Sequence, residues 1–355
     1  MTVEPLFETT RGDMVESVHY GSIAVVDSTG KLLASKGDPH AVAFLRSSAK
    51  PFQALPFVES GGVEQFNITA AELSISCASH EGSDMHVQVV EEMQKKVGVD
   101  ENFLQCGVHM PGDAKAFKRL IVNDQLPAAN RNNCSGKHTA MLAYAKMRGH
   151  PLENYLDIEH PIQQEILASF AEMCLIPSEE IRLGTDGCSA PNFAIPLFNA
   201  ALGMARLCDP HELPRARAEA CRKITTAMTT HPEMVSGYGE FDCELMRAGE
   251  GQIVSKRGAE GFQIAGLLPG MLGKDSPGVG IAFKVADGDA SHRDIDLEPS
   301  SRVRPALTVE ILRQLGALSS EQELALGRFG PVTSIQNHRG IVTGKAYPLF
   351  EMQGY

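Results

Sequence analysis

The chain has 355 residues, and 32 lysine and arginine residues against 44 aspartate and glutamate residues give it a formal net charge of −12. At roughly 150 residues per domain, this length predicts about two structural lobes. A hydrophobic content of 43% and a charged content of 21% are typical of a globular protein and disfavour disorder. Because the charge is negative and no lysine or arginine cluster offsets it, a nucleic-acid partner is disfavoured.

Membrane and disulfide-rich classes are also disfavoured. No stretch approaches the roughly 20 apolar residues of a membrane helix, and the best candidate, 264–272, contains two glycines and a proline. Residues 1–13 lack the apolar segment of a secretory signal. Eight cysteines are too few for a disulfide scaffold and form no CxxC pair. We therefore expect reduced thiols and a cytoplasmic protein.

Strand patterns open the chain. Residues 22–27 are apolar, 28–30 have turn composition and 31–35 continue the pattern, which predicts a β-hairpin. A further short apolar run covers 42–45.

From Ser83 the pattern becomes helical, and Gly98 is a suitable end for that helix. Thr69 and Glu72 have the spacing of a capping box. Further helices are predicted at 136–148, 161–175, 192–207, 211–229 and 305–316, and strands at 253–255 and 280–285.

This order of elements predicts the fold class. Strands at both ends of the chain and helices between them indicate an α+β fold, in which the two chain ends form one antiparallel sheet. We expect a sheet lobe of about 1–68 and 250–355, and a helical lobe of about 69–249.

The sharpest local motif is Arg46-Ser47-Ser48-Ala49-Lys50-Pro51, which is predicted to open a helix. Ser47 and Lys50 would share one helix face, and Pro51 is tolerated in a first turn. A serine needs a base to become a nucleophile. A neutral lysine can serve, and lowering a lysine pKa of about 10.4 by about 3 units costs roughly 4 kcal/mol. SxxK also occurs by chance on surfaces.

Two later segments offer partners for this motif. Ser79, within 76–82, offers a second hydroxyl that can shuttle protons, although a capping serine at a turn gives the same pattern. Lys256, within 256–261, offers a second cation on an edge strand, although a hairpin end with a solvated lysine would look alike. The order S-x-x-K, serine, K-x-G matches the layout of penicillin-binding proteins and serine β-lactamases.

Two polar loops carry a Cys-Ser step, 132–138 and 184–191, and each is predicted to open a helix. Helix N-termini suit a carboxylate ligand, and Asp186 can hold an ammonium group. Together these loops would recognise an α-amino acid.

The same loops suggest a metal site. Cys134 and Cys188, 54 residues apart, can share a zinc ion, with Lys137 or His138 completing the set. The alternatives are inert buried thiols, a disulfide, which the compartment disfavours, or a Cys134 nucleophile with His138 as its base.

Taken together, these motifs resemble the rhizobial-type L-asparaginases, the L-asparaginase II family of serine–lysine enzymes with a β-lactamase-like fold. The resemblance spans nearly the whole chain. The segments that carry it are 11–12, 15–21, 46–53, 77–80, 106–109, 132–138, 184–191, 231–235, 256–261 and 287–288. One departure is Glu240, where the family pattern suggests arginine.

The resemblance implies hydrolysis of L-asparagine to aspartate and ammonia by a homodimer. It implies two Ser-Lys pairs, a zinc close to the site that does not attack the amide, and a set of substrate contacts. In this sequence the two implied pairs are Ser47 with Lys50 and Ser79 with Lys256. The implied zinc ligands are Cys134, Lys137 and Cys188. The implied substrate contacts are Asp186 and His138, with Arg46, Ala259 and Glu260 nearby.

The expected mechanism has Lys50 take the Ser47 proton and Ser79 relay a proton to the departing ammonia. Backbone amides at Ser47 and near Ala259 would stabilise the oxyanion, each typically worth about 3 to 4 kcal/mol. Which serine is the nucleophile stays open. The alternatives are another amidase or lactam hydrolase on this fold, the cysteine hydrolase, and a non-catalytic zinc- or amino-acid-binding protein. Nothing else in the sequence supports a Thr185 nucleophile.

Overall fold

The computed structural model describes residues 2–289 and 302–354. The chain divides into two compact units, each described below by itself. The sheet unit comprises Met1–Leu45, Ile195–Asp209 and Glu244–Tyr355, and the helical unit comprises Arg46–Ala194 and Pro210–Cys243.

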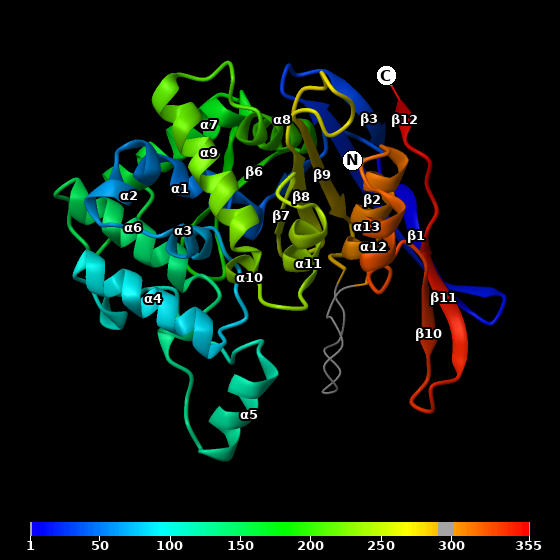
Figure 1. Ribbon diagram of the computed structural model, residues 1–355, viewed down its shortest axis with the longest axis horizontal. Helices are drawn as coiled ribbons and strands as arrows, with labels where there is room; N and C mark the ends of the chain where they lie inside the picture. Colours follow the sequence, from blue (N-terminus) through cyan, green and yellow to red (C-terminus); the bar gives the residue numbers. More distant parts are fainter. Residues whose placement is uncertain (1, 290–301, 355) are drawn as a thin grey trace. The chain divides into compact units, whose positions relative to one another are not determined.

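The sheet unit is built on a nine-stranded sheet in which strands from both ends of the chain lie side by side (Figure 1). The strand order is β10-β11-β1-β2-β9-β8-β7, and β3 joins β2 and β12 off this path. Its strands are β1 (Glu4–Arg11), β2 (Met14–Asp27), β3 (Leu32–Lys36), β7 (Ile253–Arg257), β8 (Phe262–Leu267), β9 (Val279–Val285), β10 (Thr333–Gln336), β11 (Val342–Pro348) and β12 (Gln353–Gly354). Every described pairing is antiparallel, for example Val25 opposite Ile281. The predicted α+β class, with an antiparallel sheet formed by both chain ends, is therefore confirmed.

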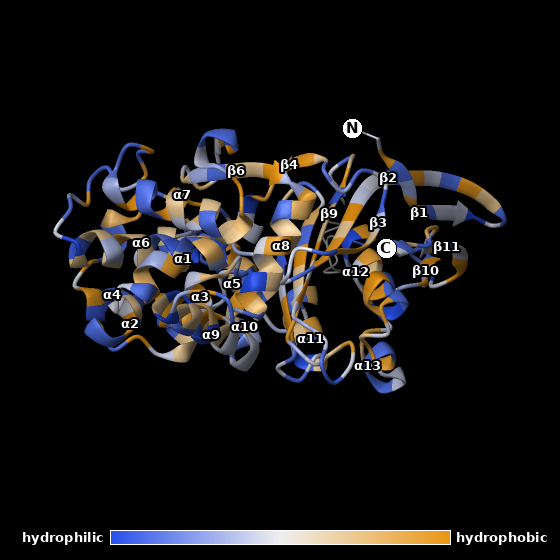
Figure 2. Cartoon of the chain, turned by 90° about the horizontal axis from the view of Figure 1, so that it is seen from above, coloured by the Kyte–Doolittle hydropathy of each residue, from blue (hydrophilic) through white to orange (hydrophobic). Residues whose placement is uncertain are grey.

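Helix α8 (Leu197–Cys208) covers one region of this sheet, against β2, β8 and β9. The residues of α8 are mostly hydrophobic, and the helix is therefore drawn largely in orange tones in Figure 2. The close approach requires glycine, because a Cβ on Gly280 would lie 1.8 Å from the Ala201 carbonyl oxygen. Strand β4 (Val42–Phe44) and helices α12 (Val303–Gln314) and α13 (Ser320–Ala325) also belong to this unit, and α12 packs against β1, β8 and β11.

The helical unit is arranged around α1 (Lys50–Glu59), which packs against α6, α7 and α9 and is buried from Lys50 to Val58. Its other helices are α2 (Gly62–Gln65), α3 (Ala70–Ser76), α4 (Asp84–Val97), α5 (Ala114–Val122), α6 (Ser135–Met147), α7 (Pro161–Cys174), α9 (Arg215–Thr230) and α10 (Pro232–Val235), and α11 (Phe241–Ala248) starts at its end. Four short 3-10 turns are η1 (Arg46–Ala49), η2 (Glu101–Phe103), η3 (Ala129–Arg131) and η4 (Ser178–Glu180). β5 (Arg182–Thr185) and β6 (Pro191–Pro196) pair antiparallel.

Several local predictions are confirmed. The Thr69 side chain accepts from the Glu72 amide, and the Glu72 side chain accepts from the Thr69 amide, so the capping box is present. Ser83 caps α4, and Gly98 ends it in the left-handed conformation. The predicted hairpin is β2–β3.

Three predictions are wrong in part. The helix predicted at 192–207 begins only at Leu197, because Pro191 to Pro196 form β6 and the Leu197 amide donates to Ala41. The helix predicted from 211 begins at Arg215, directly after Pro214. The loop 184–191 does not open a helix but joins β5 to β6, through a turn in which the Asp186 amide donates to the Ala190 carbonyl.

The unit boundaries differ from the expected lobes. Residues 46–68 belong to the helical unit, since α1 packs among its helices, and 195–209 belong to the sheet unit, since α8 packs on the sheet. No helix of the described part is long and apolar enough to cross a membrane.

Candidate active site

The first candidate residue, Lys50, begins α1 and is only 1% exposed. Strand β4 before it ends at Phe44, and the 3-10 turn η1 carries Ser47 immediately ahead of the helix. Pro51 occupies the first helical turn as predicted, where a missing amide hydrogen costs little. Ser47 therefore lies three residues before Lys50, in the turn that leads into the helix.

The Lys50 amine is held by three oxygens from two other segments. It contacts the Ala78 carbonyl, the Ser79 hydroxyl at 3.0 Å and the Asn133 carbonyl at 3.2 Å. Carbonyl oxygens only accept hydrogen bonds. The Lys50 amine therefore donates to both carbonyls, and it also donates to the Ser79 hydroxyl oxygen, so its orientation is fixed.

Ser79 lies in the loop that follows α3 and is 3% exposed. Its amide donates to the Val235 carbonyl at 2.9 Å, and the Glu81 amide donates to Ser236 at 3.0 Å. The neighbouring His80 ring contacts the Ser135 hydroxyl at 3.0 Å, which ties this loop to the start of α6. The loop is thus fixed on both sides of the serine.

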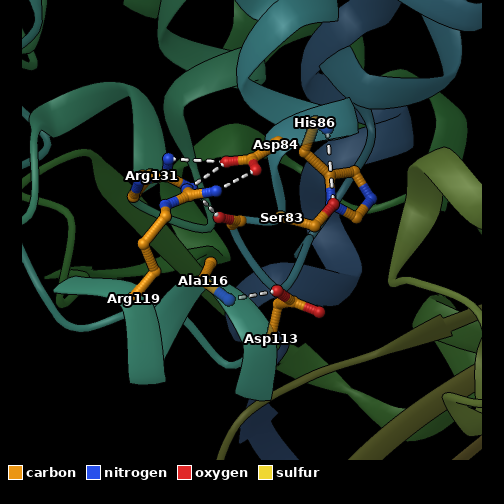
Figure 3. A network of polar contacts seen from close by, with 8 residues as sticks. Ser83, Asp84, His86, Asp113, Ala116, Arg119 and Arg131 are labelled. Carbon is orange, nitrogen blue, oxygen red and sulfur yellow. Dashed lines mark hydrogen bonds and ion pairs between the residues drawn. The ribbon is translucent and has the colours of Figure 1, made fainter. Parts of the chain in front are cut away.

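A polar network stabilises the end of this loop that leads into α4 (Figure 3). Asp84, at the start of α4, pairs with Arg119 and with Arg131, and Arg131 also donates to the Gly82 carbonyl at 2.7 Å. The hydrogen bonds from Arg119 and Arg131 hold the pKa of Asp84 well below its usual range. Asp113 caps α5 through the Ala116 amide at 2.6 Å.

Arg46 and Asp186 form an ion pair, with Nε 2.5 Å from Oδ1. Arg46 has a φ of 53°, a left-handed conformation that non-glycine residues adopt at a cost and that is often found at functional sites. Its amide donates to the Asn192 side chain at 3.1 Å, which anchors the turn to β6. Burial alone would raise the pKa of Asp186, but Arg46 and Lys137 outweigh it and lower that pKa.

The predicted zinc ligands Cys134, Lys137 and Cys188 come together. The Lys137 amine donates to the Cys188 sulfur at 2.9 Å, and Cys106 and Ala190 pack around the two thiols. A hydrogen bond from the Cys188 thiol lowers the pKa of Cys134 and raises that of Cys188. Burial would lower the pKa of Lys137, but the charge on the two sulfurs raises it.

This donor set fits zinc, because two thiols and an amine that loses its proton can supply three ligands of a tetrahedral site. Residues 2–289 and 302–354 contain no group of three His, Cys, Asp or Glu side chains suited to a metal. The site therefore reaches three ligands only by including Lys137. None of the eight cysteines is in a disulfide.

His138 is fully buried beside these residues, with its Nδ1 2.6 Å from the Tyr155 hydroxyl. Burial lowers its pKa to about 4, because the opposing effect of Cys188 is smaller. The His138 ring also has a hydrogen bond with the Cys188 side chain, which acts to lower the pKa of Cys188. The sequence analysis missed Tyr155, and the residues around it form no motif that could have indicated it.

The remaining candidates lie in the sheet unit. Lys256 is fully buried on β7, and its amine donates to the Arg257 carbonyl at 3.0 Å. Ala259 and Glu260 form the turn to β8, closed by the Gly258 amide donating to Phe262 at 2.8 Å. Glu260 has a φ of 57°.

Comparison with known proteins identifies the family. The model of the family described as L-asparaginase II matches residues 7–348, so the chain belongs to this family. Membership makes it an amidohydrolase that acts on L-asparagine, an L-asparaginase of class EC 3.5.1.1. No curated protein matches the chain.

Solved structures give more distant similarities. The chain is similar to a probable glutaminase from Bacillus subtilis complexed with 6-diazo-5-oxo-L-norleucine, with 12% identity over 84% of each chain and a TM-score of 0.40. It is also similar to the protein Mglu, with 14% identity over 84% of this chain and 68% of that chain and a TM-score of 0.44.

Proposed function

We propose that the protein hydrolyses L-asparagine through an acyl-enzyme formed on Ser47, with Lys50 as the base. The observation that carries this proposal is the buried contact between the Lys50 amine and the Ser79 hydroxyl at 3.0 Å. In the proposed arrangement Ser47 is the nucleophile, Lys50 is the base and Ser79 is the proton carrier. The half-buried Ser47 suits attack on a substrate, and the buried Ser79 suits proton transfer.

In the first half-reaction, Lys50 takes the hydroxyl proton as the Ser47 oxygen attacks the side-chain amide carbon. Backbone amides, including that of Ser47, stabilise the oxyanion. The C–N bond then breaks, and the proton passes from Lys50 through Ser79 to the leaving nitrogen, which departs as ammonia. Water attacks the aspartyl ester by the reverse proton path, which releases aspartate and restores the serine.

The family resemblance assigns Lys256 to a second pair with Ser79. The resemblance also implies substrate contacts near Ala259 and Glu260. Replacing Lys256 by methionine tests this assignment, since a large loss of kcat is expected if the amine acts in the chemistry.

In this proposal Arg46, Asp186 and His138 bind the substrate. Asp186 is a suitable partner for the α-ammonium group, and the Arg46 pair keeps it ionised. The resemblance implies a substrate contact for His138, whose buried ring contacts Tyr155 and Cys188.

Zinc would be held by Cys134, Lys137 and Cys188. When bound, the ion supplies a fixed positive charge that stabilises two thiolates and orders the loops that carry them. We further propose, from the resemblance, a homodimer, testable by size-exclusion chromatography with light scattering. Eight cysteines without a disulfide suit a reducing compartment.

The test is ammonia release from L-asparagine by the wild type and by Ser47→Ala. We expect a loss of several orders of magnitude in kcat for Ser47→Ala, because the role is covalent. Ser60→Ala, an exposed serine at the other end of α1, is the control and should keep full activity. Wild-type binding of asparagine without ammonia release would favour the non-catalytic alternative.

A further inference from the structure

The segment 106–109 carries part of the family resemblance but has no role in the proposed mechanism. Hydrogen bonds join this segment to the loop that opens α6. The Asn132 side-chain amide donates to the carbonyl of Cys106 at 2.9 Å and to that of Gly107 at 3.0 Å. Gly107 has a φ of 73°, a left-handed conformation that glycine adopts at little cost. The segment is therefore fixed against the residue that precedes Asn133.

The last residue of this segment, His109, contacts the same loop. The Asn133 amide donates to Nε2 of His109 at 3.0 Å, and Nδ1 of His109 lies 2.8 Å from the Met110 carbonyl oxygen. An amide only donates and a carbonyl only accepts, so Nδ1 carries the ring proton and Nε2 is the acceptor. Both partners are backbone groups, and neither belongs to a proposed zinc ligand. The half-buried ring is thus held in one orientation by the backbone.

Asn133 connects this ring to the candidate base. Its amide is held by His109, and its carbonyl accepts from the Lys50 amine at 3.2 Å. The Cys134 amide, which belongs to the same peptide group as that carbonyl, donates to the Asn132 side chain at 2.9 Å. A chain of hydrogen bonds therefore runs from His109 through Asn133 to Lys50.

We propose that His109 is a positioning residue, which holds the Asn133 carbonyl where it orients the Lys50 amine for proton transfer. This inference rests on the proposed function, in which Lys50 is the base. The amine also contacts the Ala78 carbonyl and the Ser79 hydroxyl, so loss of the His109 acceptor displaces the amine without releasing it. Displacement of a base slows the chemical step more than it weakens substrate binding, because the base acts in the transition state.

The experiment compares His109→Phe with His109→Gln. Neither variant has the Nδ1 donor to Met110, but only glutamine offers an oxygen that can accept from the Asn133 amide. His109→Ala also lacks an acceptor, and it replaces His109→Phe as the test if the larger ring prevents folding. The control is His211→Phe, an exposed histidine before α9. The readouts are kcat and KM for L-asparagine, zinc content, and Tm, which shows that each variant is folded in the assay.

For His109→Phe we expect kcat to fall about ten- to a hundredfold, the usual effect of a misplaced catalytic group, while KM changes less than about threefold. His109→Gln should keep kcat within about threefold of the wild type, because the hydrogen bond from Asn133 is restored. In a Lys50→Met background, His109→Phe should not lower the residual rate further, because the group that it positions is gone. Zinc content should equal that of the wild type in every variant.

The inference is overturned if His109→Phe leaves kcat unchanged, if His109→Gln is as slow as His109→Phe, or if the losses of His109→Phe and Lys50→Met multiply. A loss of kcat only in variants that have lost zinc also overturns it, since the ring would then act through the thiol cluster. Each of these results, with an active wild type and an inactive Lys50→Met, leaves the proposed function intact. Full activity of Lys50→Met overturns both.

Discussion

The amine of Lys50 lies 3.0 Å from the hydroxyl oxygen of Ser79, although Lys50 begins α1 and Ser79 lies in the loop that follows α3. The contact is buried, and the backbone carbonyls of Ala78 and Asn133 complete the surroundings of the amine. Lys50 therefore has a fixed orientation, which a base that must face a hydroxyl requires.

Replacing Lys50 by methionine keeps the length and apolar stem of the side chain but removes the base. We expect kcat to fall by about a thousandfold or more. The kcat of Ser79→Ala should fall by a similar amount. The kcat of the double variant should fall little further, because the two groups act as a unit. The control is Lys146→Met, an exposed lysine that donates to Gly98. Additive losses in the double variant would argue against a shared proton path.

Asp186→Asn tests the role of the Arg46–Asp186 pair in binding. The neutral amide cannot compensate an α-ammonium group, and it leaves Arg46 without its ionic partner. We expect KM for asparagine to rise about ten- to a hundredfold, the usual size of a charged hydrogen bond. Asp157→Asn, an exposed carboxylate, serves as the control. An unchanged KM would remove Asp186 from substrate recognition.

Metal analysis tests the thiol cluster. We expect about one zinc per chain in the purified protein. Cys188→Ala should lose that zinc, whereas Cys174→Ala, at the end of α7, should keep it. Because a ligand of the folded state stabilises it, a chelator should lower the Tm of the wild type. A wild type that holds no zinc, and whose Tm a chelator does not change, would contradict this assignment.

His86 makes stability depend on pH. It is buried between Ser83 and Glu233, and its ring stacks on His80 at 5.0 Å. Burial lowers the pKa of His86 below its usual value of 6.5, and the opposing effects of Glu233 and Asp113 are smaller. The contribution of His86 to the free energy of unfolding is therefore fully present above about pH 6.5. It is lost as the pH falls below that value, because the unfolded chain binds the proton before the folded chain does.

The corresponding measurement is urea unfolding between pH 5 and 8. The free energy of unfolding of the wild type should fall below about pH 6.5. His86→Gln should be less stable at pH 8 and lose less stability on acidification. Equal slopes for the two proteins would show that another group causes the pH dependence.

Part of this site was predictable from sequence, because some of its determinants are local. Pro51 and the strand before Arg46 place Lys50 at a helix start, and the Cys-Ser loops indicate the thiol cluster. Other determinants are not local. The Lys50 amine is held by the carbonyls of Ala78 and Asn133, which any residue carries, and Tyr155 reaches His138 from a loop without a motif.

The fold likewise has local determinants, which the sequence predicts, and non-local ones, which it does not. The capping box at Thr69 and the helix end at Gly98 depend on neighbouring residues and were correctly predicted. The pairing of β1 with β11 joins residues more than three hundred positions apart, such as Phe7 and Pro348, so it is decided by tertiary packing. The segment 192–196 reads as the start of a helix but forms a strand, because it pairs with β5.

The most direct test of the central claim is to label the nucleophile covalently with a diazoketone analogue of asparagine and to locate the adduct by peptide mass spectrometry. The mechanism predicts one adduct on Ser47, absent from Ser47→Ala and strongly reduced in Lys50→Met. An adduct on Ser79, Thr185 or Cys134 instead would contradict it.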